Sequence, residues 1–201
     1  MNKRAMLVFA GLIALASAAA VAQSTVRIRG TISGLDGNLL SVKSRDGKDL
    51  KINLADNVSV VAAKAVALAD IKPGDFVGPA SKMGPDGKLI AISLQLFPAA
   101  LRGVVPEGHM PWDLEPGSMM TNAIVSAAVQ SAKGRELTLE YKGGTQTVTV
   151  PEGVPIFTTV PGDRSLLVPG AYLFTIARAG ADGSLSAARI SVSKDGVKPA
   201  N

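Results

Sequence analysis

The amino-acid sequence predicts an all-β protein made of two tandem homologous small β-barrels, and three observations support this fold class. Apolar and polar residues alternate along several short segments, which is the pattern of strands with one buried face. Asp-Gly pairs stand between such segments at 36–37, 46–47, 86–87 and 182–183, and these pairs favour tight hairpin turns. The chain also repeats itself at an offset of 96 residues, which indicates two copies of one domain.

The first copy is expected over residues 24–98. Its alternating apolar residues are Val26, Ile28 and Ile32, then Leu50, Ile52 and Leu54, then Ile90, Ile92, Leu94 and Leu96. The segment "AKAVALAD" (63–70) is the one candidate helix, although it is shorter than a typical helix and ends before a Pro-Gly turn. This copy therefore predicts five or six short strands.

The second copy is expected over residues 122–193. "LVPGAYLFTIARAGADGSLSAARISV" (167–192) matches "IKPGDFVGPASKMGPDGKLIAISLQL" (71–96), and "ELTLEY" matches "LLSVKS" after a one-residue slip. An open sheet of about 70 residues would leave its edges exposed, and closure into a barrel removes them. We therefore expect an OB-like or SH3-like barrel in each copy, with the two barrels packed together.

The N-terminal segment predicts export. Residues 1–22 combine a basic start, an apolar run and a small-x-small site ending at Ala22, as a cleaved signal peptide does; retention as a membrane anchor is the alternative. No later stretch approaches the length of a spanning helix. The expected location is periplasmic or secreted, and residues 194–201 are expected to form a flexible tail. The chain has no cysteine, so disulfides and thiolate chemistry are excluded.

The predicted interdomain linker, residues 99–121, concentrates the unusual residues of the chain. The stretch "VPEGHMPWDLEPGSMMTN" (105–122) holds the only histidine, the only tryptophan and three of the six methionines. Its three prolines keep it out of helix. We expect this linker to cross the groove between the barrels with Trp112 as a wedge. His109 and Asp113 should hydrogen-bond to main chain, and Asn122 should start the next strand.

The same residues carry a family resemblance. The pattern "DG-x-LLSVKSRDGK", "LADIKPGDFVG" and "DGKLIAISL" resembles a bacterial family of small exported β domains of unknown function. The linker is similar to the "GH-x-PWDL…S-x-MTNA" signature of two-domain members of that family. The resemblance covers essentially the whole mature chain. It implies the fold and export, and it implies no established activity.

A metal site is the first alternative function. Copper would be held by imidazole and thioether groups, and His109, Met110, Met119 and Met120 offer both within twelve residues. In extended chain, neighbouring residues point to opposite sides. At most one of each adjacent pair would then face a common site, and packing between barrels is the competing use of the methionines.

Catalysis and nucleic-acid binding are not expected. A hydrolase would use His109 as base, Asp113 to orient it and Ser118 as nucleophile, but no G-x-S-x-G elbow surrounds any serine. Aromatic residues are too few for a base-stacking surface. A basic face on the first strands is expected to be solvated or to attract an acidic partner; it comprises Arg27, Arg29, Lys43, Arg45, Lys48 and Lys51.

Together these observations predict a non-catalytic envelope protein that acts as a binding or scaffolding module. Its partner would be an envelope protein, a polysaccharide or a lipid headgroup. The alternative is a copper or other metal-binding protein, and a hydrolase is a weaker one. No cofactor is expected outside the copper alternative.

Overall fold

The computed structural model describes residues 24–131 and 134–199, so the predicted signal peptide, residues 1–22, lies outside the described residues. The described chain is all-β, as predicted, and its only helical pieces are three 3₁₀ turns, Leu68–Asp70, Ala99–Leu101 and Arg164–Leu166. None of these described helical pieces has the length and apolar character needed to cross a membrane.

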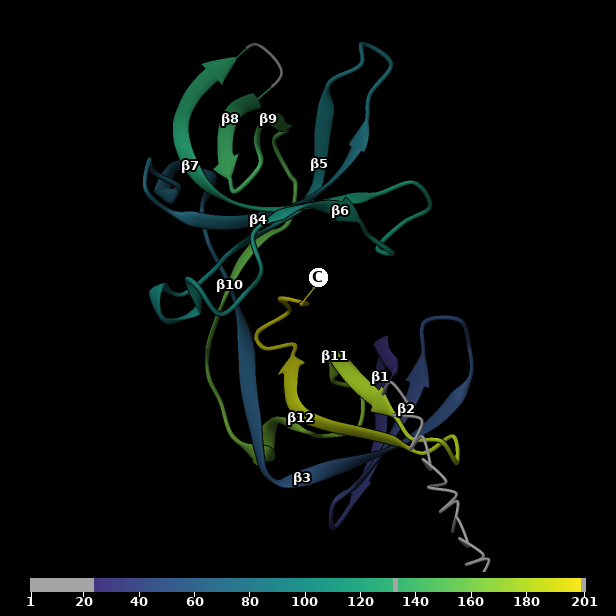
Figure 1. Cartoon of the computed structure of the whole chain (residues 1–201). Coiled ribbons are helices and arrows are strands. Elements are labelled where there is room, and N and C mark those ends of the chain that lie inside the picture. The colour runs from purple at the N-terminus through teal and green to yellow at the C-terminus, as the bar shows by residue number, and fades with distance from the viewer. Residues whose placement is uncertain (1–23, 132–133, 200–201) are drawn as a thin grey trace, which may run out of the picture.

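Twelve strands follow one another along the described residues and fill two lobes (Figure 1). They are β1 (Ser24–Asp36), β2 (Leu39–Ser44), β3 (Asp49–Ala65), β4 (Phe76–Met83), β5 (Leu89–Leu96), β6 (Gly108–Pro111), β7 (Met119–Ser131), β8 (Gly134–Tyr141), β9 (Gly144–Val150), β10 (Ile156–Pro161), β11 (Tyr172–Ala179) and β12 (Leu185–Val192). The four predicted Asp-Gly turns are confirmed, since Gly37, Gly47, Gly87 and Gly183 all adopt positive φ angles.

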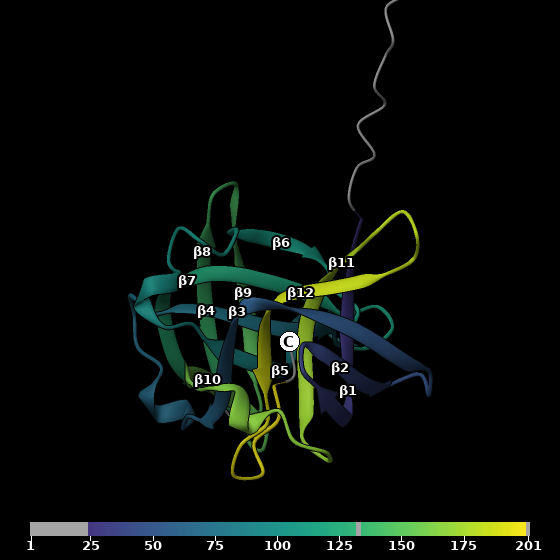
Figure 2. The same cartoon turned by 90° about the horizontal axis from the view of Figure 1, so that it is seen from below.

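Five strands close into a barrel, which we call the first barrel. Its order is β1-β2-β3-β12-β11, and the pairing of β11 with β1 completes the circuit. β11 and β12 lie with β1 and β2 in the lower lobe of Figure 1, and Figure 2, in which the lobes overlap, again shows these strands close together. The barrel has its own apolar core, in which Leu40, Ile52, Leu173 and Ile190 are fully buried.

Five other strands form a second circuit of pairings, which we call the second ring. The order β5-β4-β7-β8-β9 is closed by a short parallel contact of Leu89 with Val148 and of Ile90 with Thr149. A separate apolar core fills it, and Leu94, Leu137 and Leu139 are fully buried there. The second ring is the upper lobe of Figure 1.

The expectation that each copy closes its own barrel is wrong. Strands β1 and β3 of the first copy, expected over 24–98, pair with β11 and β12 of the second copy, expected over 122–193. Strands β4 and β5 of the first copy pair with β7 and β9 of the second. The copies therefore exchange their last two strands, and the two circuits are intertwined rather than tandem.

The exchange occurs where the chain leaves β3. This strand is 17 residues long, and instead of turning back it runs across the seam and pairs antiparallel with β10. In the second copy the equivalent stretch is interrupted by "PEGVP" (151–155), which separates β9 from β10. Proline has no N–H to donate to a ladder, so Pro151 and Pro155 account for the break.

Three other boundaries differ from the sequence-based expectations. Residues 63–70 do not form the candidate helix, because β3 runs to Ala65 and only a 3₁₀ turn follows. The predicted linker 99–121 contains β6, and β7 begins at Met119 rather than at 122. Within the predicted tail 194–201, Lys194 pairs with Val197 and Pro199 is buried, while residues 200–201 lie outside the described chain.

Candidate functional site

The candidate site is an apolar cavity of about 430 Å³ between the two lobes, which we call the interlobe cavity. Each lobe and both connecting segments contribute to its wall. The first barrel provides Arg27, Phe174, Ile176, Arg189 and Ser191, and the second ring provides Gln95, Met120 and Asn122. The β3–β10 crossing provides Val61, Phe157 and Thr159. The segment between β5 and β7 provides Phe97, Leu101, Met110 and Trp112 among others. The exchange of strands therefore creates the site.

Residues 105–118, which we call the strap, close one side of the cavity. Strand β6 of the strap pairs with β7, so this part belongs to the second ring. Beyond β6 the strap forms a tight loop, since the N–H of Trp112 donates to the carbonyl of Ser118 at 2.8 Å. The Ser118 hydroxyl, itself buried, donates to the carbonyls of Trp112 and Glu115. Hydrogen bonds within the loop therefore fix its shape, and the side chains of Trp112 and Asp113 extend from it to the first barrel.

Three arginines of the first barrel hold this loop. The guanidinium of Arg27 lies 4.1 Å from the centre of the Trp112 ring, a cation–π distance. Arg29 forms a 3.0 Å salt bridge with Asp113. Arg45 donates to the carbonyls of Leu114 at 2.7 Å and Asp113 at 2.8 Å. The strap thus connects the second ring to the first barrel, and Trp112 lies at the seam.

Arg29 is the most unusual of these arginines because it is only 4% exposed. Its guanidinium lies between the rings of Trp112, at 5.7 Å, and Phe174, at 4.8 Å. Burial lowers the pKa of Arg29, and the charge of Asp113 opposes that shift. An arginine keeps its proton in proteins, so a buried cation depends on Asp113. The expectation that this residue sits on a solvated basic face is wrong for Arg29.

The predicted linker contacts differ in their partners. His109 Nδ1 lies 2.9 Å from the hydroxyl of Thr121 instead of contacting main chain, and burial lowers the pKa of His109. The Asp113 carboxylate accepts from Arg29 rather than from a backbone group. Asn122 lies inside β7, where its side-chain amide donates to the carbonyl of Pro106 at 3.0 Å. His109, Asp113 and Asn122 therefore all hold the strap in place, but their hydrogen-bond partners differ from the expected ones.

The candidate copper ligands fall on two faces of the β6–β7 ribbon. Met110 is paired with Met120, and both line the interlobe cavity. His109 is paired with Thr121, and alternation along the strands places it with Met119 on the opposite face. The structure therefore brings together two thioethers without the imidazole. Within the described residues, no cluster of three or more His, Cys, Asp or Glu side chains could hold a metal ion.

The three residues of the hydrolase hypothesis are also separated. His109 contacts Thr121, Asp113 contacts Arg29, and the Ser118 hydroxyl is occupied by two carbonyls of its own loop. A nucleophile needs a base within hydrogen-bond reach, and the base needs its own orienting group. This arrangement has neither contact.

Buried polar atoms distinguish the interlobe cavity from the rest of the described surface. Six buried side-chain polar atoms with no hydrogen-bond partner are identified in the described chain. Four of their residues line this one cavity: Trp112, through its indole N–H, Asn122, through Oδ1, Thr159 and Ser191, through their hydroxyls. Such a group costs about 1 to 3 kcal/mol when it finds no partner. Asn122 and Thr159 are 8% and 7% exposed, so bulk water does not relieve them.

Close packing fixes Asn122 in this position. Gly78 of β4 lies against it, and a Cβ atom at Gly78 would come within 2.8 Å of both Asn122 Oδ1 and the Phe97 ring. The Phe97 ring is itself held against Phe76, with 4.9 Å between the ring centres. The absence of a side chain at Gly78 therefore allows an amide and an aromatic ring to share one wall of the cavity.

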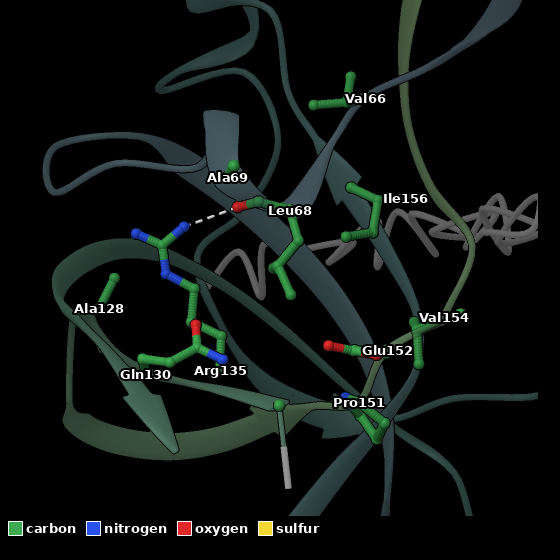
Figure 3. Close-up of a pocket in the computed structure, with 12 residues that line it drawn as sticks. Val66, Leu68, Ala69, Ala128, Gln130, Arg135, Pro151, Glu152, Val154 and Ile156 are labelled. Atoms are coloured by element: carbon green, nitrogen blue, oxygen red, sulfur yellow. Dashed lines mark hydrogen bonds between the residues drawn. The ribbon is translucent and has the colours of Figure 1, made fainter. Parts of the chain in front are cut away.

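A second depression, of about 690 Å³, lies where the β3–β10 crossing meets the second ring (Figure 3). Arg135 points across it and donates to the carbonyl of Leu68 at 2.7 Å. None of the buried polar atoms without a partner in the described chain belongs to its lining. This depression is larger than the interlobe cavity, but the hydrogen bond that crosses it joins two groups of the protein itself. The interlobe cavity is therefore the better candidate for a ligand site.

Sequence reasoning identified the strap but missed most of the cavity. Thr159, Ser191 and Arg189 carry no motif, and their strands do not adjoin in sequence. One signal was present in the repeat: Val61 and Phe157 occupy equivalent positions, as do Gln95 and Ser191, and all four line the cavity. Comparing the chain with models of protein families, with curated proteins and with solved structures found no match. The function is therefore argued from the geometry of this site.

Proposed function

We propose that this chain is a non-catalytic binding protein that holds a small, largely apolar molecule in the interlobe cavity. The observation that supports this most directly is that four residues with a buried, unpartnered polar atom line one apolar cavity. Ligand sites are typically concave and apolar, have volumes of about 300 to 1,000 Å³ and contain a few placed polar groups. Both the size and the lining of the interlobe cavity fall in this class.

The mouth of the cavity supports the same proposal. Ile176 is 52% exposed and Val104 is 69% exposed, and both belong to the lining. Large apolar side chains at the rim of an apolar cavity provide a path for a ligand that leaves water. Met110 and Met120 add flexible side chains to the wall, and methionine adapts to irregular ligand shapes.

The proposed setting is the cell envelope. The expected signal over residues 1–22 and the resemblance to exported two-domain β proteins both favour a periplasmic or secreted protein. In that setting the two circuits, which we regard as a duplicated barrel, would form a rigid frame around the ligand. A polysaccharide or protein scaffold role would instead use the outer faces and would leave the cavity unexplained.

A neutral fluorescent probe tests this function. N-phenyl-1-naphthylamine is titrated into the full mature chain, into Ser191→Leu and into Ser186→Leu as matched control. Ser191 lines the cavity, whereas Ser186 lies on the same strand, exposed and outside it. We expect saturable binding to wild type and control, and at least ten-fold weaker binding to Ser191→Leu. Because the substitution also removes an unpartnered hydroxyl, the variant should stay folded.

Two results would overturn the proposal. One is the absence of saturable probe binding to the wild-type protein. The other is equal binding by Ser191→Leu and wild type, because a leucine side chain at this position would occupy part of the cavity.

A further inference from the structure

If the proposed binding function is correct, the charge of the cavity wall indicates the charge of the ligand. Two arginines, Arg27 and Arg189, line the interlobe cavity, and no aspartate or glutamate does. The nearby carboxylate of Asp113 is engaged with Arg29 at 3.0 Å. From this charge distribution we infer that the ligand is an anionic amphiphile, with its negative group at the mouth and an apolar body inside.

The two guanidinium groups are available for such an anion. In the part of the chain that the structure describes, neither Arg27 nor Arg189 forms a salt bridge, and both side chains are exposed. Arg27 lies over the Trp112 ring at 4.1 Å. A guanidinium stacked by its face keeps its N–H groups at the edge, where a carboxylate binds in bidentate geometry.

The strand register brings the two arginines to one wall. Arg27 of β1 is the direct partner of Ile176 of β11, and the next strand, β12, carries Arg189, whose carbonyl accepts from Thr175. The exposed Ile176 therefore lies beside the positive charges at the mouth. A charged head beside an apolar rim is the arrangement that an amphiphile matches.

The interior determines the rest of the ligand. Met110, Met120 and Phe157 provide apolar wall, and the unpartnered groups of Thr159 and Ser191 can each donate to, or accept from, a hydroxyl or keto oxygen. At about 30 Å³ for each water-sized group, 430 Å³ accommodates roughly 14 such groups. The ligand is thus a medium-chain or compact ring acid rather than a lipid with two long chains.

Competition against the neutral probe tests the charge preference. N-phenyl-1-naphthylamine bound to the full mature chain is displaced with decanoate, decyl sulfate and decanol, which share one chain length. We expect both anions to compete about ten-fold better than decanol, because each of the two arginine contacts with an anion contributes on the order of a three-fold change in affinity. A difference between decanoate and decyl sulfate would identify the preferred head group.

Variants assign the preference to the two arginines. Arg27→Gln and Arg189→Gln should each reduce the anion advantage about three-fold, and the double variant should abolish it. The anion advantage is the ratio of the decanol and decanoate competition constants measured on the same variant, so a change in probe affinity that the substitutions cause cancels. Arg178→Gln is the matched control, since Arg178 is an exposed arginine of β11 outside the cavity lining. Thermal melts of each variant confirm folding.

The outcomes separate this inference from the proposed function. If the probe binds and Ser191→Leu weakens it, but decanol competes as well as decanoate, only the anionic class is wrong. The same conclusion follows if the double arginine variant keeps the full anion advantage. If the probe does not bind to wild type, the proposed function itself fails.

Discussion

Ala63 and Thr159 are partners in the antiparallel pairing of β3 with β10, and 96 residues separate them. That separation equals the offset of the internal repeat, so the two residues occupy equivalent positions in the two copies. The register of this ladder is symmetric about the pair, since Phe157 lies opposite Ala65 and Pro161 lies opposite Val61. Because Thr159 also lines the interlobe cavity, the proposed binding site lies beside the centre of this symmetric ladder.

The cavity departs from that symmetry in its chemistry. Val61 is equivalent to Phe157, and Gln95 is equivalent to Ser191. The copies thus place different groups on opposite walls of the same cavity. A symmetric site would suit a symmetric ligand, whereas this one distinguishes the two ends of a ligand, as an amphiphile requires.

Trp112 should contribute substantially to the stability of the protein through the seam between the two lobes. Replacing Trp112 by alanine removes its contact with Arg27 and Arg29 and opens the seam. Truncating a buried tryptophan costs about 3 to 5 kcal/mol, and this ring is only partly buried. We therefore expect a loss of about 2 kcal/mol and a melting temperature lower by roughly 4 to 8 °C.

Thermal melts and solution scattering measure this effect. Trp112→Phe is the matched control, because it keeps an aromatic face for the arginines and removes the unpartnered indole N–H. It should lose less than half as much stability as Trp112→Ala. An unchanged melt and an unchanged scattering profile for Trp112→Ala would contradict a locking role.

The salt bridge of Arg29 with Asp113 should contribute more to the free energy of unfolding than an exposed ion pair does. Asp113→Ala leaves a cation that is 4% exposed without its carboxylate, and breaking a buried pair costs about 3 to 5 kcal/mol. The Asp113 side chain is 46% exposed, so water replaces part of the loss, and we expect about 2 kcal/mol by chemical denaturation.

Glu115→Ala is the matched control on the same loop. Its carboxylate lies 3.2 Å from Lys82, and both side chains are well exposed, so the change should stay within about 0.5 kcal/mol. The double replacement Arg29→Met with Asp113→Leu should recover most of the stability lost by Asp113→Ala, since an apolar pair avoids the uncompensated charge. Equal losses for Asp113→Ala and Glu115→Ala would contradict this account.

Because of His109, the protein should become less stable as the pH decreases below neutral. Burial lowers the pKa of His109 below its ordinary value of 6.5, so the unfolded chain binds the proton more readily than the folded chain. Its contribution is fully present well above pH 6.5 and is lost as the pH falls through that value toward the folded pKa. Melting temperatures between pH 7.5 and 5 should show this decline.

His109→Gln should remove that part of the decline, because glutamine does not titrate and can still bond to Thr121. The exposed carboxyls with lowered pKa values act at more acidic pH: the pKa of Asp46 is about 2, held down first by its hydrogen bond from Ser44. A decline between pH 7 and 5.5 that persists unchanged in His109→Gln would contradict the assignment.

Local pattern was enough to predict the strands and the turns. The alternation around Ile52 and Leu54 and the turns at Asp86-Gly87 depend on short-range preferences that the fold keeps. The two separate cores follow from the same alternation, since each circuit buries one face of every strand. The unusual composition of the strap also predicted that Trp112 and Asp113 belong to one contact region.

The strand exchange could not be predicted from that pattern. Because the two copies are similar in sequence, β4 and β5 present the same kind of edge to β1 and β3 as β11 and β12 do. Contacts within one copy and contacts between copies are then nearly equivalent in energy. The choice between pairing within one copy and pairing between copies depends on whether the chain turns back after Val60 or continues to Ala65. No turn signal marks that segment. The cavity lies between strands of both copies, so it was missed for the same reason.

The exchange makes a prediction about severed chains. Residues 23–104 contain β1 to β5, and residues 105–201 contain β6 to β12. In the intact protein β1 and β3 pair with β11 and β12, while β4 and β5 pair with β7 and β9. Neither fragment should therefore melt cooperatively as a monomer, because each would leave sheet edges and apolar core exposed.

Produced together, the fragments should assemble into a 1:1 complex with the circular dichroism spectrum of the intact chain. Asp113→Ala in the second fragment should weaken this complex, since Arg29 and Asp113 then lie on different fragments, whereas Glu115→Ala should not. Residues 23–104 alone should form homodimers at high concentration, because a second copy can supply equivalents of β11 and β12. Sedimentation velocity measures each species, and a cooperative monomer of residues 23–104 would show that a single copy can close on itself.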